Sequence, residues 1–180
     1  AGTLAIQNGL GGVQIVGSSG NTIGGTAPGP RNVISGNRWD GVHLGTFASN
    51  NLIQGNFIGV DVTGLVDLGN GPFGGDGVDL EGAFGSPSNN TIGGLTAGAG
   101  NVISGNGGAG VRLTGADDNV VQGNFIGTNA AGTLDLHNDA TGIHVSGLNN
   151  LIERNTIAFN LMSPPDDTGV AVVLGTGNAI

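Results

Sequence analysis

The sequence contains no cysteine, no lysine and no tyrosine, and these absences exclude several classes of protein. Without cysteine there is no disulfide framework and no thiolate metal site. Arginine is the only strongly basic residue, and the 180 residues carry a formal net charge of −9. Such a chain argues against binding to nucleic acid, because phosphates are neutralised by clustered cations, and against binding to anionic lipid surfaces.

Long apolar runs are also missing. The longest, VAVVL at residues 170–174, is far too short to cross a membrane, so no membrane insertion is predicted. The 39 glycines disfavour helices, and no helix-length stretch has apolar residues at helical spacing. The glycines keep no strict period of three, which excludes collagen, and the regular recurrence of Val, Ile and Leu excludes disorder.

What the chain does contain is a long internal repeat. Residues 21–56 read NTIGGTAPGPRNVISGNRWDGVHLGTFASNNLIQGN, and residues 90–124 read NTIGGLTAGAGNVISGNGGAGVRLTGADDNVVQGN. A period of about 69 residues, dense in Gly and Asn and with short apolar pulses, is typical of a solenoid.

Each block divides into smaller units that begin with Gly-Val-x-Leu or a close variant, here called GVxL. Two further pulses of the form Asn-x-Ile follow before the next copy begins. Each unit therefore predicts three short strands, with one or two apolar side chains on one face of each. The copies of GVxL stand at residues 12–15, 41–44, 77–80, 110–113, 142–145 and 169–172.

Three short strands per unit, stacked on the equivalent strands of the next unit, predict an all-β chain folded as a parallel β-helix. Its interior would consist of columns of aliphatic side chains about 4.8 Å apart, for which β-branched residues are well suited. The prediction is one domain, residues 1–180, with about five full coils. The coils span residues 12–40, 41–76, 77–109, 110–141 and 142–168, with partial coils at 1–11 and 169–180.

Two sets of asparagines mark the predicted corners, one at the start of the second strand of each coil and one at the start of the third. Asparagine tolerates left-handed backbone and bonds locally, as a sharp turn requires, and stacked amides can bond to one another in ladders. We interpret both sets as structural rather than as rows of ligands. The sets are Asn21, Asn51, Asn90, Asn119 and Asn150, and Asn32, Asn56, Asn101, Asn124 and Asn155.

The GVxLxG…NxIxGNxIG units resemble the right-handed parallel β-helix repeats of the pectin-lyase-like superfamily, and especially the Gly/Asn-rich arrays of bacterial surface proteins. The resemblance covers nearly the whole chain and implies a right-handed coil. It does not fix an activity, because the superfamily includes lyases, hydrolases, epimerases, phage tailspikes and non-catalytic adhesins. It also implies that a substrate groove would run along the GVxL sheet.

Candidate catalytic side chains lie on the outward face of that predicted sheet. Two carboxylates two residues apart are compatible with glycoside hydrolysis, and a histidine beside them can act as acid or base. The alternative is a ladder of alternating charges that stabilises a solvated sheet face. The sequence leaves both interpretations open. The candidates are His43, Asp79, Glu81, Arg112 and His144.

Two long turns, residues 60–76 and 128–141, are rich in oxygen-bearing side chains. Calcium prefers oxygen ligands, which makes Asp61, Asp67 and Asp76 calcium candidates. Their spacing matches no known calcium motif, so capping of the turns by Asx side chains is the alternative. No other cofactor is predicted. Trp39, in the turn before GVHL, either shields the core or covers the edge of the groove.

The regular repeat favours a non-catalytic extracellular or cell-surface module, serving as a stalk, adhesin segment or filament, because an active site usually interrupts a repeat with unique residues. The alternative is a carbohydrate-active enzyme, a polysaccharide lyase, hydrolase or epimerase, acting on the GVxL face. An acidic chain without lysine or cysteine is typical of exported bacterial proteins. The expected partners are further copies of the chain, because open coil ends are templates for strand pairing, or an extracellular glycan.

Overall fold

The structure is a computed structural model that describes residues 4, 6–27, 31–161 and 168–180. All regular elements in this part of the chain are short β-strands, and neighbouring strands pair in parallel. Parts of the predicted coils 1–11, 12–40 and 142–168 lie outside the described residues. No helix in the described ranges is long and apolar enough to span a membrane.

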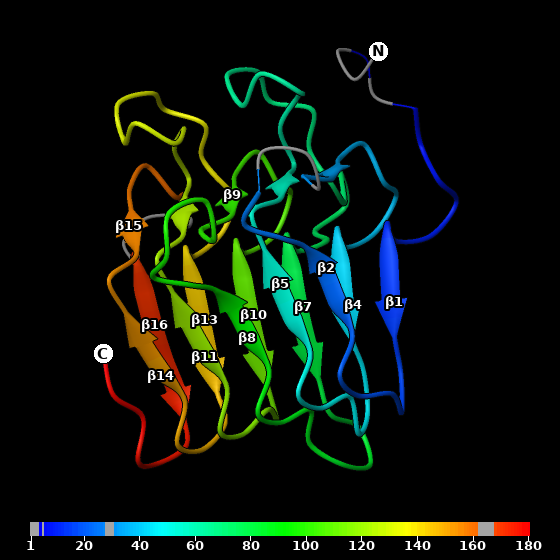
Figure 1. Ribbon diagram of the computed structural model, residues 1–180, viewed down its shortest axis with the longest axis vertical. Helices are drawn as coiled ribbons and strands as arrows, with labels where there is room; N and C mark the ends of the chain where they lie inside the picture. The colour runs from blue at the N-terminus through cyan, green and yellow to red at the C-terminus, as the bar shows by residue number, and fades with distance from the viewer. Residues whose placement is uncertain (1–3, 5, 28–30, 162–167) are drawn as a thin grey trace.

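The strands form three sheets, and consecutive strands belong to different sheets (Figure 1). The first sheet holds, in order, β1 (Val13–Ile15), β4 (Val42–Leu44), β7 (Val78–Glu81), β10 (Val111–Thr114), β13 (Ile143–Ser146) and β16 (Val170–Leu174). The second holds β2 (Thr22–Gly24), β5 (Leu52–Gln54), β8 (Thr91–Gly93), β11 (Val120–Gln122) and β14 (Leu151–Glu153). The third holds β3 (Val33–Ile34), β6 (Phe57–Ile58), β9 (Val102–Ile103), β12 (Phe125–Ile126) and β15 (Thr156–Ile157).

The chain therefore winds through the three sheets once per coil, for about five turns, as the sequence predicts. Pairing is in register, so that equivalent residues of successive GVxL units lie side by side, for example Val78 beside Val111. The interior columns are confirmed: the aliphatic residues of the central coils, such as Leu80, Ile92 and Ile103, are fully buried. A strand of two to five residues buries little alone, so each coil depends on its neighbours for stability.

Both predicted asparagine sets form hydrogen-bonded ladders along the coil axis. In each, the side-chain Nδ2 of one asparagine donates to the Oδ1 of the equivalent residue in the next coil, at 2.9–3.2 Å. In the ladder that opens the second strands, the left-handed positions are the residues just before the asparagines rather than the asparagines themselves. Asn50 and Asn89, which precede Asn51 and Asn90, have φ of 54° and 55°.

A third ladder, which we call the turn ladder, runs along the corner before the first sheet. Its amides are bonded at 2.7–2.9 Å, and it was not recognised from the sequence. The members are Asn8, Asn37, Asn70, Asn106, Asn138 and Asn160. The glycines that begin the GVxL units lie against this ladder: a Cβ added at Gly77 would fall within 2.8 Å of Asn106 Nδ2.

The long turns 60–76 and 128–141 fold back over the outer face of the third sheet, at the top of Figure 1. There they cover a second apolar cluster, in which Val60 and Leu136 pack against Phe57 and Val102. Each turn closes with one antiparallel bridge, Val60 to Asp67 in the first. The turns thus shield apolar residues that a two-residue strand would otherwise leave exposed.

Candidate functional site

The polar residues predicted to line the GVxL face occupy neighbouring strands of the first sheet. His43 on β4 is paired in register with Asp79 on β7, which is paired with Arg112 on β10, and Arg112 with His144 on β13. The outward direction of these side chains follows from the alternation of a strand whose valine and leucine face the core. Register alone brings the predicted candidates together in one line.

Asp79 is more deeply buried than a residue on a solvated face should be, with 6% of its surface exposed. Its Oδ2 lies 2.9 Å from Nδ1 of His43. Burial raises the pKa of the Asp79 carboxyl, an effect that the hydrogen bond from His43 opposes. The same hydrogen bond raises the pKa of His43, against the opposing effect of burial. The pair orients the imidazole, with Nδ1 committed to the carboxylate.

The second oxygen of this carboxylate, Oδ1 of Asp79, is buried and has no hydrogen-bond partner among the described residues. A buried carboxylate oxygen without a donor is costly, because it has lost water and gained nothing in exchange. Asp79 therefore has capacity for a further partner, such as a water, a proton or a cation.

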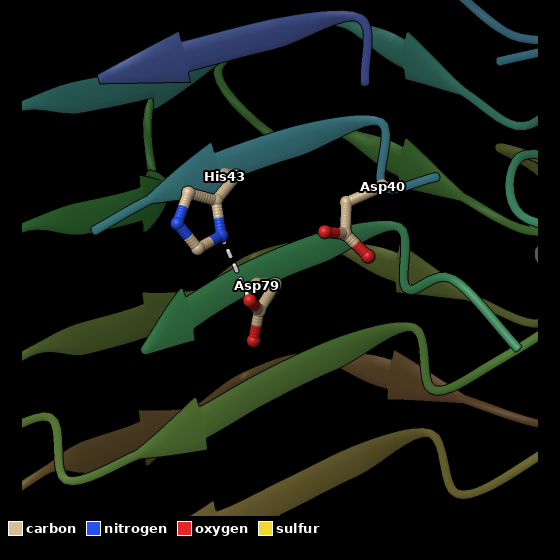
Figure 2. Close-up of side chains that lie close together, drawn as sticks. All are labelled: Asp40, His43 and Asp79. Atoms are coloured by element: carbon tan, nitrogen blue, oxygen red, sulfur yellow. Dashed lines mark hydrogen bonds and ion pairs between the residues drawn. The ribbon is translucent and has the colours of Figure 1, made fainter. Parts of the chain in front are cut away.

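Asp40 joins the pair from the turn before β4 (Figure 2). One ligand atom from each of Asp40, His43 and Asp79 lies within 4.8 Å of the other two. Asp40 was missed from the sequence because it precedes the strand. A signal was present, however: Asp40 and Asp76 both stand immediately before the glycine of a GVxL unit.

This shared position gives the two aspartates the same structural task. Oδ1 of Asp40 accepts the backbone N–H of Asp76 at 2.7 Å, and Oδ1 of Asp76 accepts the backbone N–H of Ala109 at 2.6 Å. Each carboxylate thus fixes the turn of the following coil. The backbone bond also holds Asp40 in place beside His43.

Arg112 bonds to Asp76 rather than to its register neighbour Asp79. Its Nε lies 2.6 Å from Oδ2 of Asp76 and its Nη2 3.2 Å from Oδ1, a two-point contact. Burial raises the pKa of Asp76, and the bonds from Arg112 oppose that rise. The expected alternation of charges along the face is therefore only partly formed: His43 pairs with Asp79, whereas Arg112 turns to a residue outside the line.

The two remaining candidates lie at the margin of this cluster. His144 is half-buried, and burial lowers its pKa, reinforced by the positive charge of Arg112. Glu81 is exposed at the end of β7, where its register neighbour is Thr114. The structure thus assembles His43 and Asp79 closely, adds Asp40, and leaves Glu81 outside.

A hollow of about 410 Å³ opens beside Asp40 and His43. Its walls include Gln14 from β1 and Trp39, which keeps 47% of its surface exposed. This exposure favours the groove-edge interpretation of Trp39 over shielding of the core. A larger hollow of about 670 Å³ lies by the long turn, beside Asp67, but no histidine lines it. The smaller hollow is therefore the better candidate for chemistry.

The three calcium candidates lie apart, each with a structural contact. Asp61 accepts bonds from the Thr63 hydroxyl at 2.7 Å and from the backbone N–H groups of Leu65 and Val66, as an Asx cap does. Asp67 accepts the N–H of Gly69 at 2.8 Å, and Asp76 pairs with Arg112. In the described ranges, the three aspartates do not converge on one point.

Comparisons of the chain with protein families, with curated proteins and with solved structures returned no match. The parallel β-helix fold is therefore established by strand pairing alone, and the resemblance to pectin-lyase-like repeats stays a prediction. Chemically, the site offers an oriented imidazole, two carboxylates and an exposed indole beside a hollow. Such a set can move a proton, stack on a ring or bind a cation.

Proposed function

We propose that the chain is a rigid β-solenoid spacer of an extracellular or cell-surface protein, with a structural or adhesive role. The observation that supports this is the continuity of the three asparagine ladders. Each ladder passes from coil to coil without a gap between β1 and β15. The proposed partners of the protein are further copies of the chain or an extracellular glycan.

Rigidity follows from what it costs to separate two coils. Asn101, for example, bonds with its side chain to Asn56 in the preceding coil and to Asn124 in the next, and is fully buried. A gap between coils that is too narrow to admit water would leave these amides without partners, at roughly 1–3 kcal/mol for each unsatisfied group. Three ladders therefore resist both bending and fraying along the axis.

Distance measurement by pulsed electron resonance tests the spacer. Because the chain has no cysteine, Ser18→Cys and Thr176→Cys supply the only labelling sites, in exposed turns of the first and last coils. Five coil steps of about 4.8 Å predict one narrow distribution of label-to-label distances near 24 Å, broadened only by the motion of the labels. Asn101→Ala should widen this distribution. Gln14→Ala, which removes an exposed amide, should leave it unchanged. A broad distribution in the unmodified background would contradict a rigid spacer.

A second candidate function is carbohydrate chemistry on the face of the first sheet: cleavage of a glycan by a lyase or hydrolase, or inversion of a sugar carbon by an epimerase. The favouring observation is that His43, oriented by the buried Asp79, borders the same hollow as the exposed Trp39. An indole face is a platform on which a sugar ring can stack. The imidazole nitrogen not bonded to Asp79 would then exchange a proton with the substrate.

Release of reducing or unsaturated ends from a panel of neutral and acidic polysaccharides tests the lyase and the hydrolase, and uptake of deuterium from D₂O at a sugar carbon tests the epimerase. Asp79→Asn and Trp39→Ala should each abolish most of any activity found. Glu153→Gln, which removes a carboxylate from the second sheet, is the matched control and should leave activity unchanged. Inactivity in both assays over the whole panel, with the unmodified chain folded, would leave the spacer as the sole proposal.

A further inference from the structure

The cluster of Asp40, His43 and Asp79 differs from an ordinary surface group of acidic residues. It contains an imidazole, and only 6% of the surface of Asp79 is exposed. In addition, Oδ1 of Asp79 has no hydrogen-bond partner among the described residues. The three side chains come from two adjacent coils and point toward one another in Figure 2. Convergence of an imidazole with two carboxylates is the arrangement that metal centres use.

The charges around the cluster are unbalanced. Asp76 is compensated by the two-point contact with Arg112, which leaves that arginine committed. Asp79 is bonded to His43, whereas Arg112 attracts Asp40 and Asp79 only through space because its guanidinium is bonded to Asp76. A dication bound by two carboxylates and a neutral imidazole would balance the site. We propose that Asp40, His43 and Asp79 bind a divalent transition-metal ion.

The spacing of the ligand atoms suits such an ion. Two ligands about 2.1 Å from one zinc ion lie roughly 3.0–3.4 Å apart at angles between square and tetrahedral. Nδ1 of His43 and Oδ2 of Asp79 are 2.9 Å apart, so an ion would take the place of the shared proton after a widening of a few tenths of an ångström. Asp40 completes the set with a modest side-chain rotation, since all three atoms already lie within 4.8 Å.

The surroundings support the ligands and leave a route to them. The N–H of Asp76 holds Oδ1 of Asp40, a supporting bond of the kind that orients metal ligands. The hollow lined by Asp40 and His43 gives solvent access, and three protein ligands leave a coordination position open toward it. The imidazole selects against calcium, which takes oxygen ligands, and in favour of zinc, nickel, copper or iron.

The three histidines of the chain allow a clean test by calorimetric titration with Zn²⁺. The unmodified chain should bind one ion, and His43→Gln should weaken binding more than tenfold. His137→Gln is the matched control: His137 also sits between two aspartates, but they contact opposite ring nitrogens, at 3.2 and 3.6 Å. Those carboxylates cannot share an ion with one nitrogen, so this variant and His144→Gln should stay within about twofold.

Asp40→Asn provides a second variant, because its amide oxygen can still accept the Asp76 N–H while the charge is lost. It should also weaken Zn²⁺ binding more than tenfold, with the far-ultraviolet dichroism of the fold retained. X-ray absorption of the Zn²⁺-loaded unmodified chain needs no variant and should show one imidazole nitrogen among oxygen ligands. The proposal is overturned if the unmodified chain binds no Zn²⁺, if His137→Gln rather than His43→Gln removes binding, if no imidazole is found, or if Ca²⁺ binds as tightly as Zn²⁺.

Discussion

Gly77 is packed against Ile103 so closely that a Cβ at position 77 would overlap the Cγ2 of the isoleucine. The same added atom would lie 2.6 Å from the carbonyl oxygen of Gly110. This relationship recurs in the first five of the six GVxL units, where glycine separates the isoleucine column of the third sheet from the turn ladder. The column consists of Gly12, Gly41, Gly77, Gly110 and Gly142.

Gly77→Ala should therefore destabilise the fold although its backbone conformation suits alanine. Overpacking of a close-packed interior costs about 1–3 kcal/mol, and displacement of Asn106 from its ladder adds to this. Gly9→Ala is the matched control, because an added Cβ there meets no atom within 4 Å. Urea unfolding of both variants measures the difference; equal midpoints would mean that the glycine column is not packed as described.

Removal of one ladder amide should be costlier still. Asn101→Ala leaves the carbonyl of Ile53 and the N–H of Asn56 without their partners, at 2.8 and 2.9 Å respectively in the native fold. At roughly 1–3 kcal/mol for each stranded group, the free energy of unfolding should fall by about 2–5 kcal/mol. Gln14→Ala removes an exposed amide and should change it by less than about 0.5 kcal/mol. A loss below 1 kcal/mol for Asn101→Ala would contradict the ladder as a source of stability.

The sequence predicts the strands, the three sheets and two of the ladders because those features repeat at fixed places within each unit. Position in the repeat is enough when every coil places the same residue at the same corner. Even the grouping of His43 with Asp79 follows, since parallel register makes equivalent positions neighbours.

The turn ladder was missed because its offset from the GVxL units is not constant: Asn70 and Asn160 stand seven and nine residues before the next GVxL glycine, whereas the other four members stand four residues before theirs. Asn70 stands within the first long turn, where the sequence pattern suggested calcium ligands, and only the folded turn brings it into line with Asn37 and Asn106. Likewise, which partner Arg112 selects depends on its rotamer: Asp76 offers two oxygens, whereas Oδ2 of Asp79 is already bonded to His43. The position of a residue in the repeat does not determine which rotamer its side chain adopts or which partner it contacts.

Removal of Arg112 should lower the free energy of unfolding by more than the partial exposure of its ion pair with Asp76 suggests. Asp76 is 5% exposed, so Arg112→Met leaves a buried carboxylate with only the N–H of Ala109 as donor. We expect a loss of about 1–3 kcal/mol, below that of a fully buried pair because a third of the Arg112 side chain is exposed. Asp76→Asn in the same background should recover part of the loss. A double-mutant cycle in urea measures the coupling, and additive losses would mean that the contact contributes nothing.

His144 should make the free energy of unfolding depend on pH, with lower stability in acidic solution. Burial, and then the charge of Arg112, lower the pKa of His144 below 6.5, while Asp76 opposes them. The folded state therefore prefers the neutral imidazole, and its strand neighbour Ala171 offers no charge to change that. Below about pH 6.5 the unfolded chain takes up a proton that the folded chain does not, so the free energy of unfolding falls as the solution is acidified.

The decline should flatten once the pH passes below the pKa of His144 in the folded state, and it should vanish above about pH 7.5, where both states are neutral. Urea unfolding of the unmodified chain and of His144→Gln between pH 8 and 5 measures the effect as a difference, in which the titrating carboxylates common to both chains cancel. The unmodified chain should lose stability relative to the variant as the pH falls. A gain on acidification would mean that His144 is stabilised in its charged form by Asp76, and the balance of charges described around Arg112 would then be reversed.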